Sequence, residues 1–128
     1  MVDAAFRVSD DLLKKYEDVS NATVLGALAK RGYLKVFMYG VHSLSPGRRL
    51  VGRAVTLRYL PSRPDLQERV TRGGHGEGFN ETPRWDALEA LTPGDVLVAD
   101  CMGMSMTSTG GDVVFSRILT KKAAGLVT

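Results

Sequence analysis

The stretch DVLVADCMGMSMTSTGGDVVFSRILTKKAAGLVT, residues 95–128, decides how the chain is expected to fold. It opens with a short apolar run typical of a buried strand, and a loop of small and polar residues follows. A helical pattern over residues 112–124 comes next, and Gly125 is expected to end that helix. A second apolar, β-branched run begins directly after this glycine. Strand, loop, helix and strand in this order form a βαβ crossover, so the sequence predicts an α/β fold.

The last residues of the sequence raise a question about the sheet. Leu126, Val127 and Thr128 look like the opening of a strand, whereas a strand normally needs about five residues. A strand cut at this point leaves an unpaired edge. We therefore expect that the chain ends in mid-strand. We also expect that the remainder of the domain is a second chain, produced by cleavage after Thr128, which completes the sheet and stays bound.

Two helices are predicted near the N-terminus. The first covers residues 10–19, with Ser9 as its cap, and two aspartates favour its N-terminal end. The second covers residues 20–32, with Ser20 or Asn21 as its cap and a glycine as its stop. Both patterns are typical of helices whose apolar stripe packs on a core.

The middle of the chain predicts strands and one long polar segment. Residues 33–41 and 50–60 have the β-branched and aromatic content of strands, and turn residues separate them. Residues 61–84 are polar and glycine-rich, which predicts either a mobile excursion or a lid. In the helix after residue 111, the side chains expected on one face are those of Val114, Ile118 and Leu119.

Composition limits the class of protein. The 128 residues are 44% hydrophobic and 24% charged, which indicates one globular domain. The 17 basic and 14 acidic residues are scattered, and the pairs Arg48-Arg49 and Lys121-Lys122 lack interleaved aromatics, so the charge pattern does not favour nucleic acid. No signal peptide or membrane-spanning run is present, and the default expectation is a cytoplasmic protein without a membrane partner.

The sequence contains several reactive residue types that are candidates for a site. One cysteine and two histidines cannot build a zinc site, so any metal must be held by carboxylates and water. His75 and Glu77 have the residue types of an acid/base pair, but they lie in a glycine-rich loop. Cys101 is either a nucleophile or a buried inert thiol, and the neighbouring methionines are expected to pack. Ser105 and Ser108 lack the sequence context of a serine hydrolase.

The strongest candidate site is the loop and helix start within residues 99–114. Ligands of α/β folds gather beyond the C-terminal ends of strands and at helix N-termini. Gly110 and Gly111 permit close approach of a ligand, and the amides of residues 112–114 are expected to be unpaired. This pattern fits an amide nest for a substrate carboxylate, beside an aspartate that can orient metal-bound water. The alternative is that Asp112 only complements the helix dipole and that the glycines only form a loop.

Four segments together resemble the RraA-like family. They are ATVLGALAKRG (residues 22–32), GVHSLSPGRRLVGRAVTLRYLP (40–61), LTPGDVLVADCMG (91–103) and GGDVVFSRILTKKAAGLVT (110–128). The family contains the regulator of ribonuclease E activity and the class II 4-hydroxy-4-methyl-2-oxoglutarate/4-carboxy-4-hydroxy-2-oxoadipate aldolases. The resemblance covers most of the chain outside the polar segment.

This resemblance implies a particular set of site residues. In the aldolases of the family a Gly-Asp pair at a helix start binds pyruvate through backbone amides, which corresponds here to Gly111, Asp112, Val113 and Val114. Asp112 is then expected to orient water on a Mg²⁺ or Mn²⁺ ion. The family continues after this strand into a D-G-x-x-R-D motif, whose arginine holds pyruvate and whose last aspartate ligates the metal. That motif would fall beyond Thr128.

The resemblance also implies fold, assembly and reaction. It predicts a swivelling-domain α/β fold with a central mixed β core flanked by helices, in a homotrimer or hexamer with the site at a subunit interface. The expected reaction is metal-dependent retro-aldol cleavage of a 4-hydroxy-2-oxo diacid to pyruvate, with related oxaloacetate decarboxylation. The alternatives are a non-catalytic regulator that masks a ribonuclease, and an inactive remnant.

Overall fold

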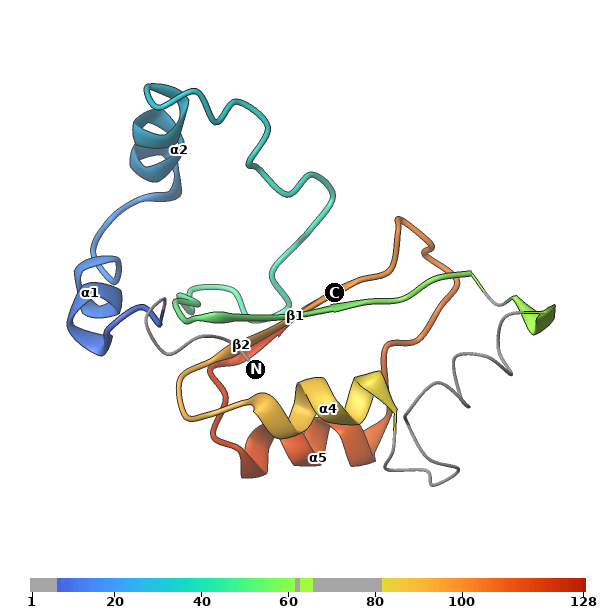
Figure 1. The fold of residues 1–128 in the computed structure, drawn as a ribbon. Coiled ribbons are helices and arrows are strands. Elements are labelled where there is room, and N and C mark those ends of the chain that lie inside the picture. The colour runs from blue at the N-terminus through green and yellow to red at the C-terminus, as the bar shows by residue number, and fades with distance from the viewer. Residues whose placement is uncertain (1–6, 62, 66–81) are drawn as a thin grey trace. The chain divides into compact units, whose positions relative to one another are not determined.

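The computed structural model describes residues 7–61, 63–65 and 82–128, and it divides into two compact units. One unit is Met1–Arg53 and the other is Ala54–Thr128 (Figure 1). The polar segment predicted over residues 61–84 lies largely outside the described residues, and so do His75 and Glu77.

A parallel sheet forms the centre of the second unit. Its strands are β1 (Ala54–Arg58), β2 (Val96–Asp100) and β3 (Gly125–Val127), in the order β1-β2-β3. Thr56 pairs with Val98, and Val98 pairs in turn with Val127. The prediction of an α/β fold is confirmed, and all the described strands are parallel. The strand predicted over residues 50–60 is present with narrower bounds.

Two helices pack side by side against this sheet (Figure 1). They are α4 (Pro83–Ala90) and α5 (Asp112–Thr120), and α5 connects β2 to β3 as the crossover predicted. The core between helices and sheet consists of buried apolar side chains: Trp85, Leu88, Leu91, Leu97, Val114 and Ile118. Each fully buried side chain of this size stabilises the fold by about 1.5–3 kcal/mol relative to an exposed one.

The face of α5 that enters the core differs in part from the prediction. Val114 and Ile118 are buried, as expected, but Leu119 is 74% exposed. Residues four apart lie above one another on a helix, whereas the next residue is turned by about 100°. Leu119, the residue after the buried Ile118, therefore points away from the core, and the prediction for this side chain is wrong.

The C-terminal end of α5 also comes earlier than predicted. The Ala123 N–H donates to the Ile118 carbonyl at 3.2 Å, and the Lys122 N–H donates to the Leu119 carbonyl at 2.9 Å. These two bonds form a Schellman motif, in which the residue after the cap turns left-handed. That residue is Lys122, with φ of 55°, and not Gly125, which already belongs to β3.

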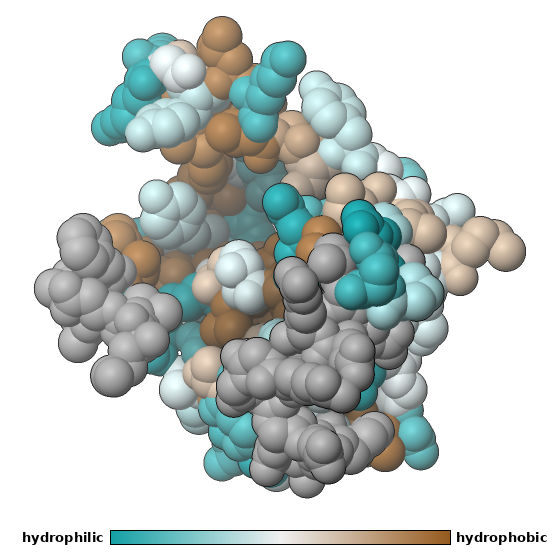
Figure 2. Space-filling view, turned by 45° about the vertical axis from the view of Figure 1, so that its right-hand side comes forward, coloured by the Kyte–Doolittle hydropathy of each residue, from teal (hydrophilic) through white to brown (hydrophobic). Residues whose placement is uncertain are grey.

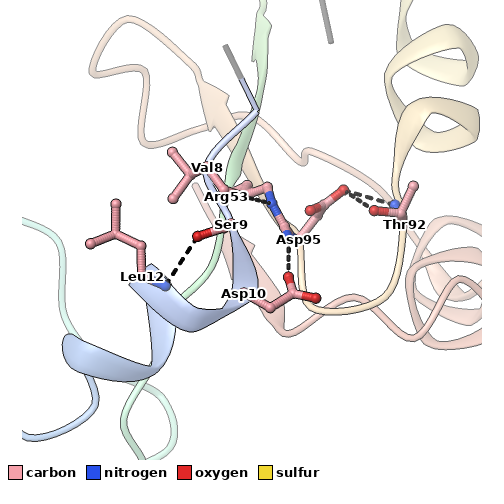
Figure 3. A network of polar contacts seen from close by, with 7 residues as sticks. All are labelled: Val8, Ser9, Asp10, Leu12, Arg53, Thr92 and Asp95. Carbon is pink, nitrogen blue, oxygen red and sulfur yellow. Dashed lines mark hydrogen bonds and ion pairs between the residues drawn. The ribbon is translucent and has the colours of Figure 1, made fainter. Parts of the chain in front are cut away.

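A tight turn before β2 holds the end of α5 in place. Asp95 is 2% exposed, and its Oδ2 accepts hydrogen bonds from the Thr92 N–H at 2.8 Å and the Thr92 hydroxyl at 2.7 Å (Figure 3). Gly94 has φ of 81°, and its N–H donates to the Lys122 carbonyl at 3.0 Å. The Ala124 N–H donates to the Asp95 carbonyl at 2.7 Å. Pro93 and Gly94 lie in this turn, as is typical of a Pro-Gly pair.

The first unit contains two capped helices. α1 (Asp10–Lys15) and α2 (Asn21–Ala29) begin after serine caps, as predicted. The Ser9 hydroxyl accepts from the Leu12 N–H at 3.3 Å, and the Ser20 hydroxyl accepts from the Thr23 N–H at 3.1 Å. Both helices are shorter than the patterns suggested.

Arg53 binds the segment at the start of α1 within the first unit. Its Nε donates to the Val8 carbonyl at 2.7 Å, and its guanidinium forms an ion pair with Asp10 (Figure 3). Arg49 acts similarly on the turn after α1, because its Nη2 donates to the Val19 carbonyl at 3.0 Å. Arginines can fix loops in this way because the guanidinium presents several donors in a rigid plane.

The strand predicted over residues 33–41 is not formed, and that prediction is wrong. A strand needs a hydrogen-bonded neighbour, and the described residues place none beside this segment within the first unit. Its apolar side chains are exposed: Tyr33, Leu34, Val36, Phe37, Met38, Tyr39 and Val41. Figure 2 shows hydrophobic residues reaching the surface among polar ones.

Candidate functional site

The C-terminal ends of the three parallel strands define one edge of the sheet. β1 ends at Arg58 and β2 at Asp100, two residues that pair in register. Just beyond the strands, the Cys101 Sγ lies 3.8 Å from the Thr128 Oγ1. Open α/β sheets bind ligands outside this edge, where loops and helix N-termini meet.

The N-terminus of α5 presents backbone donors there. Its cap residue Gly111 is extended, with φ of −108° and ψ of −161°, and provides no capping side chain. The first backbone bond of the helix is donated by the Phe115 N–H to the Gly111 carbonyl at 3.1 Å. Among the described residues, no acceptor faces the N–H groups of Asp112 and Val114. These two donors, at the positive end of a helix dipole, are suited to an anion.

The third predicted donor is already engaged. The Val113 N–H donates to the Oδ1 of Asp112 at 2.9 Å, so the expectation that all three first-turn amides are unpaired needs correction. The cause is local: an aspartate in a first helical turn can reach a neighbouring backbone N–H. The Asp112 side chain is otherwise exposed, and its carboxylate can turn toward a ligand or toward solvent.

The two glycines before α5 serve different purposes. A Cβ atom added to Gly110 would lie 2.7 Å from the Cβ of Val114, a distance that real side chains do not tolerate. A Cβ added to Gly111 would meet nothing within 4 Å. Gly110 thus permits close packing on the helix, rather than the ligand approach that the sequence suggested. Gly111 leaves the space in front of the amides open.

Tyr59, which the sequence did not point to, connects the sheet to this loop. Its hydroxyl donates to the Thr109 carbonyl at 3.0 Å, and its backbone N–H donates to the Asp100 carbonyl at 2.8 Å. Burial raises the pKa of the Tyr59 phenol, and the nearby guanidinium of Arg84 opposes this rise. The one available signal was its position, an aromatic residue directly after a strand.

Asp100 shapes the start of the loop. Its Oδ1 accepts from the Met102 N–H at 2.8 Å, and its Oδ2 accepts from the Arg58 Nε at 2.8 Å. The hydrogen bond from Met102, with a smaller effect of Arg58, lowers the pKa of this carboxyl group. Met102 adopts a left-handed φ of 55°, and the Asp100 side chain supports that turn.

The thiol and the methionines of this loop are not packed as expected. Cys101 is partly exposed rather than buried. Met102 is 55%, Met104 45% and Met106 95% exposed, so the expectation that the methionines pack is wrong for these side chains. The Ser108 hydroxyl donates to the Gly110 carbonyl at 3.2 Å, which assigns it a role in the loop backbone.

The described residues do not by themselves fit a metal ion. No group of three or more His, Cys, Asp or Glu side chains comes together in the part of the chain that the structure describes. Mg²⁺ and Mn²⁺ require several oxygen ligands, and Asp112 supplies a single exposed carboxylate. The direct ligands expected by resemblance would belong to the D-G-x-x-R-D segment.

Comparisons with known proteins place the chain among relatives. The family model described as RraA-like, Aldolase/RraA, matches residues 8–128. The crystal structure of Streptomyces coelicolor RraAS2, described as an unusual member of the RNase ES inhibitor RraA protein family, superposes with a TM-score of 0.76 at 29% identity. The match covers 94% of this chain and 52% of that one, so the chain spans about half the length of this neighbour.

Curated proteins give no significant match. None of the helices in the described residues has the length and apolar content that crossing a membrane requires.

Proposed function

Because the chain belongs to the RraA-like family, we propose that it supplies the anion-binding part of a divalent-metal-dependent lyase that cleaves a 4-hydroxy-2-oxo diacid to pyruvate. The observation that carries the proposal is the N-terminus of α5, where the N–H groups of Asp112 and Val114 face no acceptor among the described residues. They lie at the sheet edge where α/β folds bind ligands.

The geometry supports recognition of a 2-oxo acid carboxylate. Two backbone N–H groups and the helix dipole both favour a negative oxygen, and the dipole contributes about 0.3–1 kcal/mol at exposed positions. Gly111 leaves room for that oxygen to approach the amides. In retro-aldol cleavage a base takes the proton of the 4-hydroxyl, C4 becomes a carbonyl carbon as the C3–C4 bond breaks, and the electron pair of that bond passes to the pyruvate enolate. A proton added to C3 of the enolate then gives pyruvate. Fixed dipoles beside the enolate oxygen lower the barrier without having to reorganise.

A metal ion belongs to the proposal, although the described residues do not hold one. A bound Mg²⁺ or Mn²⁺ would supply Lewis-acid stabilisation of the enolate. Asp112 is proposed to contact it through water. The direct ligand and the arginine are proposed to lie in the D-G-x-x-R-D segment expected after Thr128, whether in the same polypeptide or in a second chain. We further propose a homotrimer or hexamer.

Pyruvate release tests the lyase proposal. The protein is incubated with 4-hydroxy-4-methyl-2-oxoglutarate and with oxaloacetate, and pyruvate is measured with lactate dehydrogenase, with magnesium or with a chelator. We expect magnesium-dependent release and a loss of at least tenfold in Asp112→Asn. Asp11→Asn is the matched control because Asp11 is also an exposed aspartate in a first helical turn, in α1. Absence of release from every 4-hydroxy-2-oxo diacid would reject the proposal.

The second candidate is a regulator of a ribonuclease. It is favoured by the similarity to RraAS2, which is described within an RNase inhibitor family. A regulator would bind a ribonuclease of the RNase E type and slow RNA cleavage, with no pyruvate release. Measuring RNA cleavage with purified ribonuclease, with and without the protein, separates this function from the lyase.

A further inference from the structure

We infer that Tyr59 is a positioning residue, which holds the loop before α5 so that the first-turn amides of the helix face an anionic substrate. The inference rests on the proposed function because the ligand in question is the carboxylate of a 2-oxo acid. It adds a residue that the family resemblance did not indicate.

Tyr59 binds both ends of the loop that connects β2 to α5. Its backbone N–H donates to Asp100, the last residue of β2, at 2.8 Å. Its hydroxyl donates to the carbonyl of Thr109 at 3.0 Å, 50 residues away in sequence. One residue therefore fixes the point where the chain leaves the sheet and the point where it turns into the helix.

The loop has few other ties near its far end. Among the described residues, the remaining polar contacts of residues 103–110 are local: Met104 and Thr107 bond within the loop, and Ser108 bonds to Gly110. The Tyr59 hydroxyl is accordingly the polar contact that connects this part of the loop to the sheet. Without it, no hydrogen bond among the described residues would connect residue 109 to the sheet.

Fixing Thr109 also fixes the donors that follow it. Gly110 comes next and packs against the buried side chain of Val114, where a Cβ would lie at 2.7 Å. Gly111 follows as the helix cap, with its carbonyl bonded to Phe115. The first unpaired donor, the Asp112 N–H, is thus only three residues from the Tyr59 contact.

The phenol is suited to this task at ordinary pH. Burial raises its pKa above the usual value near 10, so the hydroxyl stays protonated and remains a donor. The guanidinium of Arg84 lies beside it and polarises the hydroxyl, which strengthens the bond that the hydroxyl donates.

The test compares Tyr59→Phe with the wild-type protein and with Tyr39→Phe. Tyr39 is 86% exposed, and its substitution also removes a phenol hydroxyl while keeping the ring. Pyruvate is titrated into ¹⁵N-labelled protein, and the amide resonances of Gly111, Asp112 and Val114 are followed. Heteronuclear NOE values of the ligand-free proteins report the ps–ns mobility of residues 109–112.

For Tyr59→Phe we expect about fivefold weaker binding of pyruvate, the equivalent of one net hydrogen bond. We also expect lower NOE values confined to residues 109–112, with Leu88 in α4 unchanged. Tyr39→Phe should match the wild type in both respects. A general loss of structure would instead lower NOE values throughout the unit, so the two readouts separate positioning from folding.

Three outcomes decide the matter. If the wild type binds pyruvate and Tyr59→Phe binds equally well, the inference is overturned while the proposed function stands. If the wild type does not bind pyruvate, the proposed function fails. The NOE values of residues 109–112 in the ligand-free proteins then still test whether the Tyr59 contact holds the loop. Unchanged NOE values at residues 109–112 in Tyr59→Phe overturn the inference whatever the binding result.

Discussion

Replacing Gly110 by alanine tests the packing that places the start of α5. The new Cβ would lie 2.7 Å from the Cβ of Val114, 2.8 Å from its Cγ1 and 2.9 Å from its Cγ2. Val114 is 6% exposed and belongs to the core, so it cannot move aside into solvent. Overpacking of this kind destabilises a protein by about 1–3 kcal/mol.

Urea unfolding measures the effect directly. Trp85, the single tryptophan of the sequence, lies in the same core as Val114, so its fluorescence reports unfolding of this unit. With a slope of about 1–3 kcal/mol per molar urea, Gly110→Ala should lower the midpoint by about 1 M. Gly111→Ala is the control because its Cβ would meet nothing within 4 Å.

A double variant sharpens this test. Adding Val114→Ala to Gly110→Ala removes the Cγ1 and Cγ2 contacts, so the double variant should be less destabilised than the sum of the two single effects by about 0.5–3 kcal/mol. If Gly110→Ala instead unfolds at the same urea concentration as Gly111→Ala, the packing argument for Gly110 is wrong.

A further prediction concerns acid stability. Hydrogen bonds from Arg117, and to a smaller extent from Lys121, lower the pKa of Glu89 from 4.5 to about 2. This contact between α4 and α5 therefore stabilises the fold above pH 4.5. The stabilisation is lost as the pH falls toward 2. The gap in Tm between wild type and Glu89→Gln should therefore be larger at pH 6 than at pH 2, and an equal gap at both pH values would contradict this explanation.

The features that local sequence determines were predicted well. Ser9 and Ser20 cap their helices because a serine before a helical pattern can accept a first-turn N–H. The crossover from β2 through α5 to β3 follows from hydrophobic periodicity and turn residues, and these too are local signals.

The features that depend on distant contacts were missed. Residues 33–41 have strand propensity, but a strand forms only where a neighbour accepts its hydrogen bonds. Gly125 is the better left-handed residue by propensity, yet α5 ends at Thr120 and the left-handed residue after it is Lys122, whose carbonyl accepts a hydrogen bond from Gly94 in the turn before β2. Tyr59 escaped notice because its partner Thr109 lies 50 residues away, and no local pattern encodes that contact.

The candidate site was predicted in position more than in detail. The stretch of residues 99–114 was expected to gather at the C-terminal edge of the sheet, and β2 and α5 bring it there. Gly110 and Gly111 differ in their distance from the Val114 side chain, and two identical residues in a sequence give no sign of that difference.

The way α5 is fastened has a consequence for how such proteins can diversify. Its C-terminal end is fixed by the Lys122 turn and by the bonds to Gly94 and Asp95, at the opposite end of the helix from Gly111. The position of α5 therefore depends little on residues 102–108. Mutations can accumulate in this exposed segment with little risk to folding, so descendants of one ancestral scaffold can acquire new specificities by exchanging it.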